Sequence, residues 1–432
     1  MSDLHELHAH LYGCLTPEDL PSLAARNEPR WNFFRDSYRR VYGGEPELDG
    51  LFDDTPEARA RLESYYLYRK AETFAHFQCC FDLLISISST SREEIRDVYS
   101  RVFAREPARF AEYRQMFAPV LPDEVFKEKV LSAALAAAAA DEEHSDRATR
   151  LAVSVFRVDE HALNQYRLVR EVMRENDVAA KYITGVDFCA QEEGHPPMRK
   201  ESLFREILED NEREPDQALA VLYHVGESYV DKSVESAVRW VVQAARLGAH
   251  RLGHAVALAV NPELYQGTLR LEIVSERRDQ IAFELDHLEE LRAAGYPVDG
   301  DSLRREQEEL RGAAPDDTVE IRYDEDRVGA LGVFQDWAMG RVRETKAVIE
   351  SCPTSNLRIA GLAHAKHHPL PRFLKAGLPV TLAADDPGIL DTTLDKEYEL
   401  AAKWEGVHAE DLETVKRRGA EFRSERLSGR IR

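Results

Sequence analysis

The sequence predicts an α/β protein, a (β/α)8 TIM barrel with additional helices after its first strand and a large insertion between its sixth and seventh strands. Three observations predict this fold. Short apolar runs recur along the 432 residues, each run ends in polar residues, and most runs are followed by a stretch of helix length. Such runs are typical of parallel strands that are covered on both faces. A doubly wound sheet is the alternative that this pattern leaves open.

Eight apolar runs are the candidate strands, and eight parallel strands favour a closed barrel. They span residues 7–13, 110–118, 151–158, 182–190, 218–226, 251–257, 347–353 and 379–387. Between them, residues 233–247 carry an apolar stripe at helical spacing, and Gly248 follows as a stop signal. The alanine run at 136–140 is typical of a helix interior.

The whole chain, residues 1–432, is interpreted as one barrel with two interruptions. Residues 27–71 are aromatic and charged and predict a helical insertion after the first strand. Residues 262–345 are too long for a simple β/α connection and predict a helical and ribbon insertion, in which 319–323 alternate like a strand. This second insertion follows the sixth strand, so it emerges at the carboxyl ends of the strands. It could cap a pocket, contact a phosphate through Arg322 or Arg327, or build a homo-oligomer.

Composition excludes several classes of function. The chain has 57 Lys and Arg against 79 Asp and Glu, a net charge of −22, and no basic run, so nucleic acid is not an expected partner. No apolar run approaches the roughly 20 residues that span a bilayer, and the N-terminus lacks the features of a secretory signal. We therefore expect a cytoplasmic protein without a membrane partner. Five cysteines without C-x-x-C spacing suggest neither a disulfide framework nor a thiolate zinc site.

Side chains able to bind a metal or transfer protons cluster at the predicted strand ends. His8 and His10 are two residues apart in the first strand, so both point to the same face. In a barrel, the carboxyl ends of the strands converge on one rim. Histidines and a carboxylate there form a nitrogen and oxygen site suited to Zn²⁺ or Fe²⁺, with a position for water. The candidate residues at strand ends are His8, His10, His224, Glu227, His254, Asp385 and Asp386.

Five motifs in register resemble those of the adenosine deaminase family of the amidohydrolase superfamily. They are ELHAHLYGCLTPEDL from Glu6, HVGE at 224–227, RLGH ending at His254, ESCPTSN at 350–356, and TLAADDPGILDTTLDKEY. The resemblance implies a (β/α)8 barrel and hydrolytic deamination of an adenine-containing small molecule. It implies one divalent metal ion, zinc first and iron as the alternative. The implied ligands are His8, His10, His224 and Asp385.

The resemblance also implies catalytic roles. Glu227 would protonate the purine ring nitrogen beside the reacting carbon, and burial could keep this carboxyl protonated. His254 would orient the attacking water and take its proton, since histidine titrates where a general base works best. Asp386 would accept a hydrogen bond from the base or help to position that water. The cytidine deaminase signature, H-x-E with P-C-x-x-C, does not occur in the chain.

The expected substrate contacts are Tyr12, Gly13, Ala190 and Asp386, and the sequence departs from the family at Tyr12 and Ala190. Tyr12 stands where these enzymes place an aspartate that binds the ribose hydroxyl, so we expect a different sugar end of the pocket. Ala190 replaces a common glycine whose N–H approaches the purine. Glu192, two residues later, is expected to be solvated.

These departures leave alternatives to deamination of a plain adenosine-like nucleoside. The substrate could be an N6-substituted adenine, a nucleotide or another aminopurine. A third hypothesis is an assembly or signalling component in which the insertion mediates contacts. The acidic excess favours a nucleoside over a nucleotide.

Overall fold

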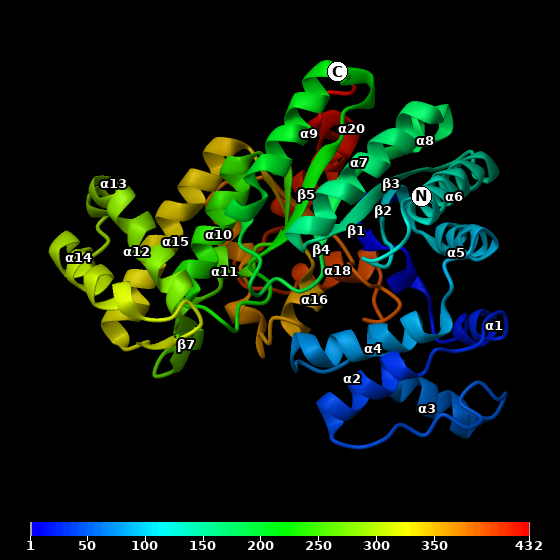
Figure 1. Cartoon of the computed structure of the whole chain (residues 1–432), viewed down its shortest axis with the longest axis horizontal. Helices are drawn as coiled ribbons and strands as arrows, with labels where there is room; N and C mark the ends of the chain where they lie inside the picture. Colours follow the sequence, from blue (N-terminus) through cyan, green and yellow to red (C-terminus); the bar gives the residue numbers. More distant parts are fainter. Residues whose placement is uncertain (1, 432) are drawn as a thin grey trace.

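An eight-stranded parallel sheet forms the centre of the computed structural model, which describes residues 2–431 and all their side chains except those of Ser2, Asp159 and Glu160 (Figure 1). The strand order follows the chain, as a β/α barrel requires. The strands are β1 (Ser2–His10), β2 (Ala108–Met116), β3 (Ala148–Phe156), β4 (Ile183–Cys189), β5 (Ala220–Val225), β6 (Arg251–His254), β9 (Val348–Ser351) and β10 (Val380–Leu382). The predicted barrel is confirmed, because all eight strands overlap the predicted ranges.

The barrel is closed between its first and last strands. His10 donates its backbone N–H to the carbonyl oxygen of Asp385 at 2.8 Å, and Asp385 donates to the carbonyl of His8 at 2.9 Å. A parallel bridge between Ala9 and Asp385 records the same pairing. This closure brings Asp385, three residues beyond β10, beside the two histidines of β1.

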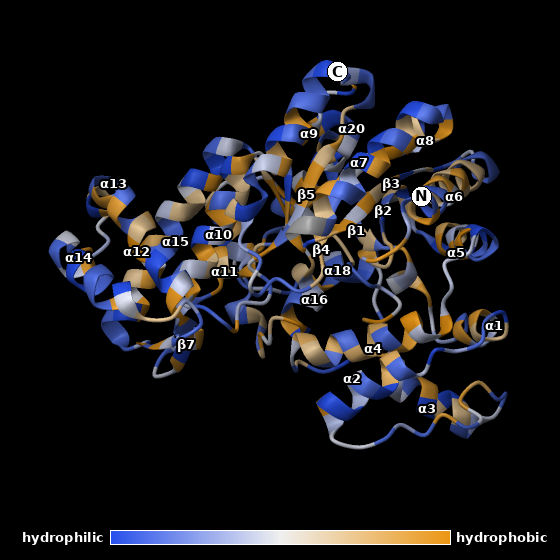
Figure 2. Ribbon diagram, viewed as in Figure 1, coloured by the Kyte–Doolittle hydropathy of each residue, from blue (hydrophilic) through white to orange (hydrophobic). Residues whose placement is uncertain are grey.

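Helices surround the strands and turn their apolar faces inward (Figure 2). Those between β2 and β6 are α6 (Asp123–Glu143), α7 (Asp159–Glu175), α8 (Asp177–Tyr182), α9 (Glu201–Arg213) and α10 (Val234–Leu247). Those after β9 are α16 (Pro353–Arg358), α17 (Leu370–Lys375), α18 (Leu394–Ala401), α19 (Ala409–Arg418) and α20 (Ser424–Leu427). The predicted helix at 233–247 is confirmed: Ser233 caps the N-terminus of α10, and Gly248 ends it with φ of 106°.

Five helices lie between β1 and β2, and the middle three form a layer at the lower right of Figure 1. They are α1 (Leu20–Ala24), α2 (Asn32–Tyr42), α3 (Pro56–Tyr66), α4 (Phe74–Ile87) and α5 (Arg92–Arg105). Residues 27–71 thus contain α2 and α3, and both pack on α4.

The chain between β6 and β9 extends to the far left of Figure 1. It comprises α11 (Val256–Ala259), β7 (Leu269–Ile273), α12 (Val274–Asp286), α13 (Leu288–Ala293), α14 (Gly300–Glu309), β8 (Thr318–Arg322) and α15 (Glu325–Thr345). β7 and β8 form a separate antiparallel ribbon, and α15 packs against α10 as a barrel helix does. The strand expected near 319–323 is confirmed as β8. In the described part of the chain, no helix has the length and apolar character needed to cross a membrane.

Candidate metal centre and active site

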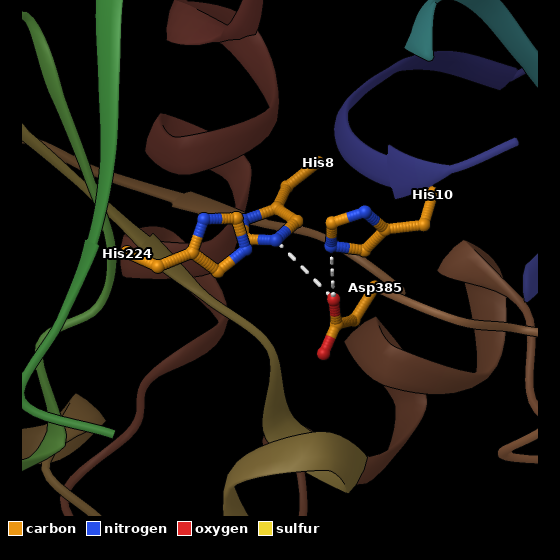
Figure 3. Close-up of side chains that lie close together, drawn as sticks. All are labelled: His8, His10, His224 and Asp385. Atoms are coloured by element: carbon orange, nitrogen blue, oxygen red, sulfur yellow. Dashed lines mark ion pairs between the residues drawn. The ribbon is translucent and has the colours of Figure 1, made fainter. Parts of the chain in front are cut away.

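Three histidines and one aspartate converge at the carboxyl ends of β1, β5 and β10 (Figure 3). The Nε2 atoms of His8 and His10 lie 3.2 and 3.4 Å from Oδ1 of Asp385. One ligand atom from each of His8, His10, His224 and Asp385 lies within 4.8 Å of the others, and only His10 is more than marginally exposed. We call these residues the His–Asp quartet. Three imidazole nitrogens and a carboxylate oxygen suit a borderline divalent cation such as Zn²⁺ or Fe²⁺.

Two buried carboxylates orient the imidazole rings from behind. Nδ1 of His8 lies 2.9 Å from Oε2 of Glu350, and Nδ1 of His224 lies 3.1 Å from Oδ1 of Asp187. Nε2 of each ring therefore faces the quartet, as is usual for histidine ligands, although Nη1 of Arg114 also lies 3.2 Å from Nε2 of His8 and 3.5 Å from Nε2 of His224. Sequence reasoning assigned no role to these carboxylates. The signal was present, because Glu350 opens the ESCPTSN motif and Asp187 is a carboxylate within the otherwise apolar, buried run VDFC.

Arg114 in β2 holds both carboxylates in place. Its guanidinium lies 2.5 Å from Glu350 and 3.2 Å from Asp187, and all three side chains are fully buried. Burial opposes ionisation of Glu350, but Arg114, His8 and Arg251 lower the pKa of this carboxyl far below its usual value. The carboxylates behind the quartet are therefore ionised, which favours cation binding in front of them.

The three predicted catalytic residues lie beside the quartet. Nε2 of His254 is 3.6 Å from Oε2 of Glu227, and both side chains are largely buried. Oε1 of Glu227 and Oδ1 of Asp386 are buried without a hydrogen-bond partner in the described structure. Burial, followed by the charges of Asp385 and Glu192, raises the pKa of Glu227, and burial with Asp385 raises that of Asp386. Glu227 thus has the raised pKa that a general acid needs.

Asn356 sets the tautomer of His254. The backbone N–H of Cys352 can only donate, and it lies 3.2 Å from Oδ1 of Asn356, which fixes the orientation of the amide. Nδ2 of Asn356 therefore faces Nδ1 of His254 as a donor, at 3.0 Å. Burial lowers the pKa of His254, so the ring is neutral and carries its single proton on Nε2. His254, Cys352 and Asp385 form a second group whose ligand atoms lie within 4.8 Å.

The predicted substrate contacts lie at the same rim of the barrel, and each has its own structural environment. Tyr12 is buried and donates its hydroxyl to Oε1 of Glu94 at 2.9 Å, so only its ring is left to contact a substrate. A Cβ on Gly13 would lie 1.7 Å from Oδ1 of Asp386, so only glycine fits there. Ala190 takes the left-handed conformation with φ of 74°, which explains why a glycine is common at this place.

The expectation that Glu192 is solvated is wrong. This side chain is buried and accepts the backbone N–H groups of Gly226, Glu227 and Ser228 at 2.8, 3.1 and 3.3 Å. Three backbone donors offset the cost of burying the carboxylate. Sequence reasoning missed this contact because it joins two loops 35 residues apart, without a local signal.

A parallel barrel with a buried His–Asp quartet and unpartnered acids at the carboxyl ends of its strands has the architecture of a metal-dependent hydrolase site. The sequence model of the adenosine deaminase family matches residues 49–281 and 325–424, more than half of the chain. The chain belongs to the adenosine deaminase family.

Individual relatives match over shorter stretches or by fold. An aminodeoxyfutalosine deaminase from Acidothermus cellulolyticus is 45% identical over 62 residues, which are 14% of this chain and 17% of that protein. The chain thus spans less than a fifth of this relative. An adenine deaminase from Arthrobacter aurescens has a similar fold, with a TM-score of 0.58, 18% identity and coverage of 98% of this chain and 94% of the other. An amidohydrolase from Burkholderia ambifaria with bound Zn also has a TM-score of 0.58, with 16% identity and coverage of 97% and 85%.

Proposed function

We propose that this chain is a metal-dependent aminohydrolase that deaminates an adenine-containing small molecule, adenosine or a related aminopurine nucleoside. The observation that carries the proposal is the placement of two unpartnered carboxyl oxygens, on Glu227 and Asp386, beside the His–Asp quartet. Membership of the adenosine deaminase family supports the reaction class. Relatives that are named adenosine, adenine and aminodeoxyfutalosine deaminases support an aminopurine substrate.

The donor set of the quartet fits a single divalent metal ion, which His8, His10, His224 and Asp385 would hold. When bound, such an ion lowers the pKa of a coordinated water toward about 7. Zinc is the ion we propose, with Fe²⁺ as the alternative, because imidazole and carboxylate ligands suit both. The zinc-containing amidohydrolase of similar fold supports this choice.

The side chains of the chain supply the proton transfers. Glu227, protonated because burial raises its pKa, donates to the ring nitrogen beside the amino-bearing carbon, which makes that carbon electrophilic. Burial and the charge of Asp385 raise the pKa of Asp386, but a cation held by Asp385 would offset that charge, and Oδ1 of the ionised Asp386 would then be free to accept the proton of the attacking water. The carbon gains the water oxygen, the proton taken from the water passes to the amino group, and that group leaves as ammonia. The remaining hydroxyl proton returns to Glu227 as the carbonyl forms. Exclusion of bulk water from these buried groups strengthens each interaction.

His254 holds the attacking water in this scheme. Its Nε2–H, fixed by the contact with Asn356, donates a hydrogen bond toward the water oxygen. This tautomer favours a role for His254 as a hydrogen-bond donor to the water. The role of His254 as the base, which the sequence suggested, stays a prediction.

A second candidate keeps the reaction and changes the substrate to an N6-substituted adenine, a nucleotide or another aminopurine. The observation that favours it is the bond between Tyr12 and Glu94. This bond occupies the Tyr12 hydroxyl at the expected sugar end. The carboxylate of Glu94 also accepts hydrogen bonds from Asn27, Ser88, Ser89 and Thr90, so a ribose would find no free carboxylate there.

A substrate panel tests both candidates. Purified protein, with its metal content measured, is incubated with adenosine, adenine, AMP and N6-methyl derivatives, while ammonia release and the ultraviolet change are followed. We expect turnover of at least one aminopurine, loss of both metal and turnover in His224→Ala, and loss of turnover alone in Glu227→Gln. His364→Ala, an exposed histidine outside the quartet, is the matched control. Full turnover by metal-free protein, or no ammonia from any aminopurine, would contradict the proposal.

A further inference from the structure

The ribbon of β7 and β8 lies against the loop that carries Glu227. We define residues 226–233, between β5 and α10, as the acid loop. The match to the adenosine deaminase family leaves out residues 282–324, which include β8. β8 pairs with β7 along five residue pairs, from Leu269–Arg322 to Ile273–Thr318. A segment outside the family pattern therefore supports the strand that touches the acid loop.

Arg270 of β7 binds two carbonyl oxygens of the acid loop. Its Nε donates to the carbonyl of Lys232 at 3.0 Å, and its Nη2 donates to that of Tyr229. The guanidinium also lies 5.3 Å from the ring centroid of Tyr229. The backbone N–H of Ile273 donates to Asp231 at 3.1 Å. Irregular backbone needs such partners when it is buried, so β7 fixes the path of the loop.

The ribbon also fixes the point where the acid loop becomes helix α10. Glu272, fully buried, accepts from the backbone N–H of Ser233 at 3.0 Å and from its hydroxyl at 2.7 Å. Tyr323, directly after β8, accepts the N–H of Val234 at 2.8 Å and donates to Glu235 at 2.6 Å. The start of α10 thus receives hydrogen-bond partners from the insertion in addition to its own cap, Ser233, which accepts the N–H of Ser236.

The other side of the acid loop is held by the loop after β4. Glu192 accepts the N–H of Glu227, and Asp231 accepts the N–H of Gly194 at 3.2 Å. Among the residues that the structure describes, the carboxyl group of Glu227 has one polar contact, with His254 at 3.6 Å. The position of this carboxyl therefore follows from the position of the loop backbone.

We propose that the β7–β8 ribbon is a brace for the acid loop and that Arg270 is a positioning residue for Glu227. The proposal rests on the proposed function, because it assigns a consequence to the placement of the proton donor. It differs from a lid or an oligomer arm, since the contacts are made to backbone groups of the loop within one chain.

The test compares Arg270→Met with Arg278→Met. Arg278 of α12 is a matched control, because it also donates to backbone carbonyls, those of Leu310 and Ala313, but within the insertion and away from the acid loop. Both full-length proteins are assayed for kcat, KM, metal content, mass in solution and amide hydrogen exchange of residues 226–233.

We expect Arg270→Met to lower kcat by about 10- to 100-fold with little change in KM, as displacement of a catalytic group does. Exchange in the acid loop should accelerate, while metal content and mass stay unchanged. Arg278→Met should match the wild type in all of these. Arg270→Lys should recover part of kcat, because lysine can donate to one of the two carbonyls.

A second variant, Tyr323→Phe, tests the brace if Arg270→Met does not fold. It removes only the hydroxyl between Val234 and Glu235, and we expect faster exchange at the end of the acid loop and a smaller loss of kcat. Wild-type exchange of residues 226–233 in both variants would overturn the brace, and so would wild-type kcat in Arg270→Met. A change in mass with unchanged exchange would show an oligomer arm instead. If no aminopurine is turned over, the proposed function fails while hydrogen exchange still tests the brace.

Discussion

Nδ1 of His8 lies 2.9 Å from Oε2 of Glu350, across the barrel from β1 to β9, and both side chains are fully buried. This pair leaves Nε2 of His8 directed at Asp385. Glu350 is therefore part of the structure that makes the quartet a cation site, although it contributes no ligand atom.

Changing Glu350 to Gln should weaken metal binding by about 10- to 100-fold, the usual effect of losing such a partner. The amide carries no charge to stabilise the imidazole ligand. Arg114 and Arg251 also lose an ion pair, so the free energy of unfolding should fall by about 3–5 kcal/mol. Competition with a chelator measures the first effect on folded protein, and urea unfolding measures the second. Unchanged metal affinity would show that the His8–Glu350 contact has no role in binding.

The buried side chain of His368 should lower the free energy of unfolding in acid. Burial lowers its pKa to about 3, while Nδ1 accepts the N–H of Leu370 and the ring packs on Trp404. Between pH 3 and about 6.5 the unfolded chain binds a proton at this residue that the folded chain does not. The free energy of unfolding should therefore fall by about 1.4 kcal/mol per unit as pH decreases through this window.

The variant His368→Asn isolates this contribution. Asparagine can accept the same N–H but does not titrate, so its stability should depend less on pH than that of the wild type. Urea unfolding at pH 4.5 and 5.5, with equal metal content, gives the two slopes. Identical slopes would exclude His368 as a source of acid sensitivity.

The barrel could be predicted because its strands and helices leave signals within short stretches of sequence. Buried parallel strands leave apolar runs, and α10 carries its own signals in Ser233 and Gly248. The boundaries near the site were less predictable. The first strand was expected at 7–13, whereas β1 ends at His10 and Tyr12 lies in a 3-10 turn. Polar residues at strand ends obscure where pairing stops.

The candidate site could be predicted in part. The structure brings together all four residues of the His–Asp quartet, because strand ends of a barrel converge whatever their separation in sequence. The partners behind and beside them depend on side-chain packing between distant loops. Glu192 under the acid loop and Glu94 on Tyr12 are examples, and no spacing rule encodes either contact.

Three non-glycine residues at the rim of the site have a strained backbone. Ala190, His254 and Asp385 all adopt positive φ, at 74°, 64° and 63°. For alanine this conformation costs about 1 kcal/mol or more. Ala190→Gly should therefore raise the free energy of unfolding by up to about 1 kcal/mol. Ala60→Gly, in the exposed interior of α3, should lower it by about 1 kcal/mol. Urea unfolding checks both, and a destabilised Ala190→Gly would contradict the assigned strain.

Asn356 offers a test of the role of His254 in which two mechanisms predict opposite results. In Asn356→Asp, a carboxylate still accepts the N–H of Cys352 but now also accepts from Nδ1 of His254. The proton of the neutral ring then moves from Nε2 to Nδ1. If Nε2–H holds the attacking water, as we propose, kcat should fall by at least about 10-fold, because a wrong tautomer can cost up to about 10⁴-fold.

If His254 is instead the base, the free lone pair on Nε2 in Asn356→Asp should preserve or raise kcat. Asn356→Ala distinguishes the effect of the tautomer from the effect of losing the hydrogen bond to Nδ1, because it removes that bond without imposing the other tautomer. If His254 donates to the water, Asn356→Ala should lower kcat less than Asn356→Asp does. Nitrogen-15 NMR of the histidines reports the tautomer directly, and metal analysis excludes loss of the ion. Finding the resting proton on Nδ1 in the wild type would refute the donor role, because Nδ1 could then not accept from Asn356.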